Sequence, residues 1–212
     1  MRWLVGDERL RVLDLGAGTG KLTRSLVALG HDVVAVEPSA EMLAQLRRVL
    51  PDVEAHEGSA ERIPLQPASI DRVVVGQAFH WFDAPKALPE IARVLTPRGG
   101  VGLVWSVLDD EHPLVERLYG LLPPFGAEGD SVDALAGSGL FGPVEEKAFG
   151  FERRFARAEL VDGVGTQSSV ARLSPGERTA TLAAVGRFYD EVAGPDGLVL
   201  PYVTSAYRTR KR

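Results

Sequence analysis

The 212-residue sequence contains no cysteine. This absence excludes disulfides, zinc–thiolate sites, iron–sulfur clusters and thiol catalysis. The sequence also lacks any run of about 18 apolar residues, so no transmembrane helix is expected. Positive charge is not in excess, because 24 Lys and Arg against 29 Asp and Glu give a net charge of −5. That balance argues against a broad basic face for nucleic acid.

Glycine is abundant, at 23 residues, which predicts tight turns or a site lined by backbone. The length favours a single domain over residues 1–212. Asp7 and Glu8 follow the first few residues too closely for a signal peptide, so a cytoplasmic location is expected. The one basic run, at 208–212, is interpreted as a solvated tail, with binding to an anionic partner as the alternative.

Short apolar runs alternate with amphipathic segments in the first half of the chain. This alternation predicts parallel β-α-β units, and therefore a doubly wound α/β fold. An apolar stripe of Met42, Leu43, Leu46 and Leu50 is expected to face inward from one helix. We expect strands at 11–15, 32–36, 53–56, 70–75 and 101–105, helices at 19–29, 39–50 and 85–95, and a turn at 97–100.

The second half is less regular. Residues 126–143 are rich in glycine and predict a loop with a short helix near 132–136. Further helices are expected at 112–122, 157–164 and 175–192, and strands at 145–155 and 198–207.

The most informative segment is Val-Leu-Asp-Leu-Gly-Ala-Gly-Thr-Gly at 12–20. Gly16 allows the chain to turn sharply off a strand, while Gly18 and Gly20 allow a ligand to approach the backbone. The N-terminal amides of the following helix then point at that ligand. A purely structural turn is the alternative interpretation.

The glycine spacing and two acidic residues narrow the choice of ligand. A dinucleotide site needs a third glycine at position 21, where this chain has Lys21. Glu37 ends the second predicted strand and can accept both hydrogens of a ribose diol; its alternative role is a favourable charge at a helix N-terminus. Asp14 lies inside the first strand and must find a partner, either turn amides or the cationic amino end of a ligand.

The glycine motif followed by Glu37 resembles the first two motifs of class I S-adenosylmethionine-dependent methyltransferases. Three more segments are similar to that family, at 58–65, 70–75 and 93–100, and residues 77–83 resemble its type-11 branch, which includes trans-aconitate-methyltransferase-like proteins. The match covers about residues 10–106. It implies a mostly parallel seven-stranded Rossmann-like sheet with helices on both faces and a small helical and loop cap.

The resemblance also implies an organisation of the chain: a cofactor-binding half at 10–106, a substrate cap at 108–175, and a final helix and strand at 176–212. Relatives carry a helical lead segment before the first strand, of which this chain has only ten residues. Either the sequence is truncated at its front end, or a lid is expected from elsewhere, such as Trp3 or a partner chain.

The implied cofactor is S-adenosyl-L-methionine, with S-adenosyl-L-homocysteine as product and no metal. Glycine-loop residues would line its methionine part, Glu37 its ribose, and Ser59 and Ala60 its adenine, while Gln77 would line the methyl-transfer mouth. The predicted cofactor-binding residues are Asp14, Gly16, Ala17, Gly18, Gly20, Glu37, Pro38, Ser59, Ala60 and Gln77.

His80, Trp81 and Trp105 are the predicted acceptor-pocket residues. His80 is the candidate general base, or else a wall of the pocket. Alternatively, the aromatic residues at 79–82 only pack a loop. Arg153, Arg154 and Tyr202 are weaker pocket candidates.

The predicted function is transfer of a methyl group to a small-molecule acceptor by in-line displacement, which rests mainly on proximity and alignment. The alternatives are a binding protein of the same fold without turnover and a nicotinamide-dependent oxidoreductase. The expected partner is a small-molecule substrate rather than a membrane or nucleic acid, and the protein is expected to be a monomer or homodimer.

Overall fold

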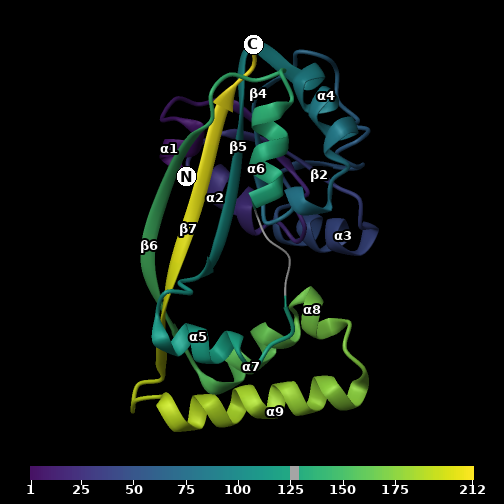
Figure 1. The fold of residues 1–212 in the computed structure, drawn as a ribbon. Coiled ribbons are helices and arrows are strands. Elements are labelled where there is room, and N and C mark those ends of the chain that lie inside the picture. Colours follow the sequence, from purple (N-terminus) through teal and green to yellow (C-terminus); the bar gives the residue numbers. More distant parts are fainter. Residues whose placement is uncertain (125–128) are drawn as a thin grey trace. The chain divides into compact units, whose positions relative to one another are not determined.

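The computed structural model describes residues 1–124 and 129–212 (Figure 1). Part of the loop predicted at 126–143, namely residues 126–128, lies outside that range. The seven strands form one sheet in the order β3-β2-β1-β4-β5-β7-β6, which confirms the α/β class. Their bounds are β1 Arg11–Leu15, β2 Asp32–Glu37, β3 Glu54–Glu57, β4 Ile70–Gly76, β5 Leu95–Leu108, β6 Glu145–Phe155 and β7 Leu198–Arg210.

The strand order reverses at β1. β1 pairs in parallel with both β2 and β4, while β2 pairs with β3 and β4 with β5, also in parallel. Leu15 lies opposite Val36 in this register, so the carboxyl ends of β1 and β2 meet at the same edge of the sheet. Open α/β sheets bind ligands at such a switch point.

A helix forms in each segment where the sequence predicted one, whereas the short helices at 2–5, 79–81 and 168–171 were not predicted. Ser39 caps α3 by accepting a hydrogen bond from the Met42 amide at 3.3 Å. Ser174 and Glu177 form a capping box at the start of α9. The bounds are α1 Arg2–Val5, α2 Lys21–Ala28, α3 Ala40–Val49, η1 Phe79–Trp81, α4 Ala84–Val94, α5 Pro113–Tyr119, α6 Gly129–Gly137, α7 Arg157–Gly165, α8 Ser168–Ala171 and α9 Pro175–Val192.

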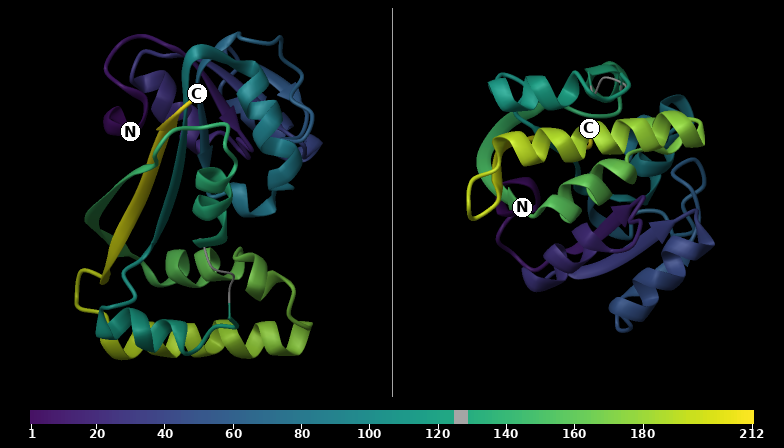
Figure 2. Two further views of the ribbon diagram at one scale, coloured as in Figure 1. Left: turned by 45° about the horizontal axis from the view of Figure 1, so that its top comes forward. Right: turned by 90° about the horizontal axis from the view of Figure 1, so that it is seen from below.

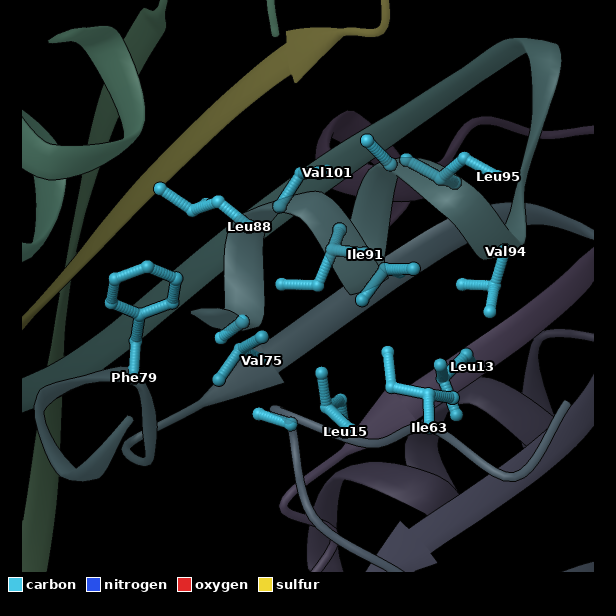
Figure 3. Close-up of a cluster of buried hydrophobic side chains, with 14 of the residues drawn as sticks. Leu13, Leu15, Ile63, Val75, Phe79, Leu88, Ile91, Val94, Leu95 and Val101 are labelled. Carbon is cyan, nitrogen blue, oxygen red and sulfur yellow. The ribbon is translucent and has the colours of Figure 1, made fainter. Parts of the chain in front are cut away.

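Alternating residues of the central strands bury opposite faces of the sheet. Val12 and Val74 pack with α1 and α2 on one face. Leu13 and Val73 pack on the other face, against side chains of α4 and α6. Figure 3 shows this second layer, with Leu88 and Ile91 of α4 over the strands. Helices therefore cover both faces, as predicted.

Two local predictions are wrong. The turn predicted at 97–100 is part of β5, because the three extra residues between Leu95 and Gly100 are absorbed as a bulge opposite Ile70 and Arg72. Met42 was expected to face the core, but its side chain is 48% exposed, since α3 directs Leu43 and Leu46 inward instead.

The basic C-terminal run is also not a free tail. β7 extends to Arg210, so most of the run belongs to the sheet. The Lys211 ammonium donates to the carbonyls of Ala92 and Leu95, at 2.5 and 3.0 Å, and therefore closes the C-terminal end of α4. The Arg208 guanidinium lies 4.4 Å from the ring of Trp3 and donates to the Trp3 carbonyl.

The chain divides into two compact units. The first comprises Met1–Trp105, Glu128–Lys147 and Ser205–Arg212, and the second comprises Ser106–Ala127 and Ala148–Thr204. In the second unit α7, α8 and α9 pack on one another around a core that includes Val164, Val185 and Phe188 (Figure 2). The functional division at residues 108 and 175 stays a prediction.

Within the described residues, no helix has both the length and the apolar character needed to cross a membrane. The same part of the chain holds no cluster of three or more His, Asp or Glu side chains suited to a metal ion.

Candidate functional site

The loop between β1 and α2 has the conformation that its glycines predict. Gly16, Gly18 and Gly20 have φ values of 74°, 56° and 87°, in the left-handed region that other residues rarely adopt. The amides of Gly16 and Ala17 both donate to the Val36 carbonyl, at 2.8 and 3.1 Å. The loop is therefore fastened to the end of β2 as it leaves β1.

The three glycines differ in the space around them. A Cβ on Gly16 would lie 2.8 Å from the Ala78 side chain, and one on Gly20 would lie 3.0 Å from Leu46. A Cβ on Gly18 would meet nothing closer than the Met42 sulfur at 4.0 Å. Gly18 thus has the most open backbone of the three, while the structure gives Gly16 and Gly20 packing roles in addition to the ligand roles predicted for them.

Glu37 is the last residue of β2 and is 6% exposed. Its Oε2 accepts a hydrogen bond from the Gly18 amide at 2.8 Å, and its Oε1 accepts one from the Ser39 amide at 2.9 Å. A carboxylate has about four acceptor positions, so two remain for a ligand. Pro38 separates Glu37 from Ser39 and is exposed.

Asp14 is buried inside β1, and one of its oxygens is unsatisfied. Its Oδ2 accepts a short hydrogen bond of 2.6 Å from the Thr23 hydroxyl, whereas Oδ1 has no partner among the described residues. Burial raises the pKa of Asp14 to about 6, against the opposing effect of the Thr23 hydrogen bonds, and the nearby charge of Glu37 adds to the rise. A cation placed at Oδ1 would reverse this effect.

The segment predicted to contact adenine follows β3. The Gly58 amide donates to the Glu37 carbonyl at 3.3 Å, which connects this segment to the end of β2. Ser59 is partly exposed, and its backbone forms an isolated antiparallel β-bridge with Arg62. Ala60, in contrast, is buried in the core. Among the two predicted adenine contacts, Ser59 is thus the more accessible.

The segment after β4 brings two aromatic side chains to the surface and buries two others. Phe79 belongs to the core and packs against the partly buried Phe82. Trp81 is 61% exposed, and its ring lies 5.0 Å from that of His80. The alternative that the aromatic residues at 79–82 only pack a loop therefore holds for Phe79 and Phe82, but it does not hold for Trp81.

Two details mark this segment further. Gln77, directly after β4, has a φ of 58° and is exposed. A residue other than glycine in this region carries strain, which is common at functional sites. Desolvation lowers the pKa of His80, so its imidazole is neutral at pH 7 and able to accept a proton.

The remaining pocket candidates lie in different surroundings. Trp105 is 1% exposed in the core and packs edge-on against Tyr207. Its surroundings are those of a core residue, although its indole N–H has no partner among the described residues. Tyr202, in the second unit, stacks on Phe151 at 5.2 Å, and Arg153 of the same unit pairs with Glu159.

Most of the predicted cofactor residues are brought together by this arrangement. Asp14, Glu37 and Gln77 lie in or directly after three adjacent strands, and the glycine loop contacts the segments that follow β2 and β4. Sequence reasoning missed Thr23, the partner of Asp14, although a polar residue beside the apolar stripe of α2 is a usable signal. It also missed Glu61, whose carboxylate accepts a hydrogen bond from the Asp83 amide; the sequence carries no comparable signal for this residue.

The fold is a doubly wound seven-stranded Rossmann-like sheet. A glycine loop follows its first strand, and an acidic residue ends its second strand. This combination is that of the class I methyltransferases. Comparison with known proteins agrees. Residues 13–103 match the family described as "Methyltransferase domain".

Two relatives extend the match over nearly the whole chain. The uncharacterized methyltransferase Rv3342 of Mycobacterium tuberculosis is 42% identical over 210 residues, 97% of this chain and 85% of the relative. The uncharacterized methyltransferase-like C25B8.10 of Schizosaccharomyces pombe is 35% identical over 97% of this chain and 84% of its own length. The chain therefore belongs to this methyltransferase family, as the sequence resemblance indicated.

A solved structure from Anaeromyxobacter dehalogenans, named as a candidate type II methyltransferase, is similar with a TM-score of 0.69. It is 26% identical, and the alignment covers all of this chain and 94% of that one. The Bacillus subtilis protein YcgJ shares the fold at 20% identity and a TM-score of 0.62, over 96% of this chain and 92% of its own.

Proposed function

We propose that this enzyme binds S-adenosylmethionine at the edge formed by β1, β2 and β4 and transfers its methyl group to a small-molecule acceptor. The observation that carries the proposal is the buried Glu37 carboxylate at the end of β2, which holds the glycine loop and keeps acceptor positions free. A structure of the same fold, a phosphoethanolamine methyltransferase from Haemonchus contortus, contains S-adenosylhomocysteine.

The residues present fit this cofactor. Asp14 has an unsatisfied buried oxygen, which suits the cationic amino group of the methionine part. The backbone at Gly18 is open to a ligand, and Glu37 offers two acceptors for a ribose diol. A ligand that carries both an ammonium group and a ribose satisfies all three features, whereas a nicotinamide dinucleotide lacks the ammonium group.

Methyl transfer from a sulfonium requires the protein mainly to align the methyl donor with the acceptor. When bound, the cofactor supplies an activated methyl group on a sulfonium, so the protein mainly has to orient the two reactants. Asp14, Gly18 and Glu37 would hold one reactant, and Gln77 would line the mouth where the two meet.

On the acceptor side, we assign His80 and Trp81 to substrate contact. A large exposed aromatic side chain offers a stacking surface to a planar or apolar acceptor. The neutral imidazole of His80 is able to accept a proton from an acceptor that must lose one, while a carboxylate acceptor needs no base.

Calorimetric titration with S-adenosylhomocysteine tests the proposal. We expect saturable binding of one molecule per chain, weakened more than tenfold in Glu37→Ala. Reduced nicotinamide dinucleotide serves as the control ligand and should show no binding. If the nicotinamide cofactor binds and S-adenosylhomocysteine does not, the proposal is wrong.

A further inference from the structure

Glu61 occupies a position between two parts of the proposed site. Its Oε1 accepts a hydrogen bond from the Asp83 amide at 2.9 Å. Desolvation raises the pKa of Glu61, but the hydrogen bonds from the Asp83 amide and the Ser59 side chain together outweigh it, so the pKa lies below its usual value. One carboxylate thus connects the adenine-side segment to Asp83, the N-cap residue of α4.

The Asp83 amide, which donates to Glu61, lies at the C-terminal end of the segment that carries His80 and Trp81. At the other end of this segment, the Gln77 amide donates to the Val104 carbonyl of β5 at 3.0 Å. Between them, η1 is a short 3₁₀ helix, which gains little stability from its own hydrogen bonds. Besides the buried Phe79 side chain, its position therefore depends on what holds it at residues 77 and 83.

The adenine-side segment has a separate anchor. Glu90 of α4 accepts a hydrogen bond from the Ile63 amide at 3.0 Å and pairs with Arg93 at 2.7 Å. Arg93 donates in turn to the carbonyls of Ile63 and Leu65, both at 2.8 Å. Residues 63–65 are therefore fixed to α4 without any involvement of Glu61.

We propose that Glu61 is a positioning residue that couples cofactor binding to the acceptor-side segment. Through Ser59 it responds to the adenine end of the cofactor, and through the Asp83 amide it holds η1, with His80 and Trp81, in place. The inference rests on the proposed function only for the identity of the ligand, because the contacts themselves need no ligand.

Hydrogen–deuterium exchange with and without S-adenosylhomocysteine tests this coupling in the 212-residue chain. In the ligand-free protein, Glu61→Ala should raise exchange in residues 79–83 by about tenfold, the loss expected for one hydrogen bond to a charged acceptor. In the wild type, the ligand should protect residues 79–83. In Glu61→Ala it should still protect residues 16–18 and 37–39 but leave 79–83 unprotected.

Glu90→Gln is the matched control, because it weakens the other anchor of the same segment. It should raise exchange near Ile63 and leave residues 79–83 unchanged. Glu61→Gln, which retains one carbonyl acceptor, covers the case in which the alanine variant does not fold, and it should show an intermediate effect.

The outcomes separate the two proposals. Unchanged exchange at 79–83 in both Glu61 variants, or equal effects of the Glu61 and Glu90 variants, overturns the positioning role. Retained ligand protection of 79–83 in Glu61→Ala also overturns it. A wild-type protein that does not bind S-adenosylhomocysteine contradicts the proposed function, while the ligand-free comparison still decides whether Glu61 holds η1.

Discussion

The Glu37 carboxylate accepts a hydrogen bond from the Gly18 amide at 2.8 Å. The residue predicted to hold the ribose therefore also shapes the loop predicted to hold the methionine part. A second hydrogen bond, from the Ser39 amide, fixes the other oxygen at the start of α3. Binding and loop geometry consequently depend on the same side chain.

Removing the Glu37 carboxylate should therefore cost more affinity than the loss of ligand contacts alone. We expect Glu37→Ala to weaken S-adenosylhomocysteine binding more than tenfold and Glu37→Gln to have a smaller effect, because the amide retains one acceptor for the loop. Calorimetry measures both. Glu8→Gln, an exposed acidic residue, is the control and should bind as the wild type does; equal affinities for all variants would contradict the assigned role.

The raised pKa of Asp14 predicts a pH dependence of stability. The native state holds the Asp14 proton up to about pH 6, whereas the unfolded chain releases it near 3.8. Stability of the ligand-free protein should fall as pH rises from about 4 through about 6, by about 3 kcal/mol for a shift of this size. In Asp14→Asn this contribution should disappear from urea denaturation measured across that range.

Ligand binding should show the opposite trend at the same residue. Ionised Asp14 attracts a cation, so affinity for S-adenosylhomocysteine should rise with pH through about 6 in the wild type. Asp14→Asn should bind weakly with little pH dependence. An unchanged pH profile in the variant would show that Asp14 does not meet the amino group.

Gly18 and Gly20 should respond differently to alanine. Both have positive φ, so alanine costs about 1 kcal/mol at either position. At Gly20 the new methyl group would also crowd Leu46 and Leu50, at 3.0 and 3.1 Å, which should add 1–3 kcal/mol, the cost of about one overpacked methyl group. Thermal denaturation should thus show the larger loss for Gly20→Ala, whereas Gly18→Ala should show the larger loss of ligand affinity relative to its loss of stability.

We expect Trp81 to contribute to acceptor binding and not to the stability of the fold. Because its side chain is 61% exposed, Trp81→Ala should change the melting temperature little. Affinity for S-adenosylhomocysteine should also be retained, while KM for an acceptor should rise by about tenfold, equivalent to a stacking contact of about 1.4 kcal/mol. Phe79→Ala is the contrasting variant, since loss of this buried ring should destabilise the fold by about 3–5 kcal/mol.

The first half of the chain was largely predictable because its signals are local. Strands such as 11–15 and 70–75 are short apolar runs, and Ser39 is a side-chain cap that the sequence displays directly. The turn expected at 97–100 failed because β5 pairs with β4 on both sides of this segment, at Leu95 and at Gly100, so the strand continues through it as a bulge. Pairing partners are not encoded in any short window.

The residues of the candidate site also divide into those that local sequence signals predict and those that they do not. Glu37 and the glycines were identifiable by spacing, since their roles follow from backbone conformation and strand order. Glu61 and Thr23 were not, because each acts through a contact formed only in the folded chain: Glu61 with Asp83, 22 residues away, and Thr23 with Asp14, nine residues away. Trp105 shows the converse, since an aromatic residue in a predicted strand carries no sign of whether it lines a pocket or fills the core, and here it is buried.

The central claim is that β1, β2 and β4 together form an S-adenosylmethionine site, and titration calorimetry of the wild-type chain with S-adenosylhomocysteine tests it most directly. We predict saturable one-to-one binding that is at least tenfold weaker in Glu37→Ala. A folded wild-type protein that shows no heat of binding, or an affinity unaffected by loss of the Glu37 carboxylate, would contradict it.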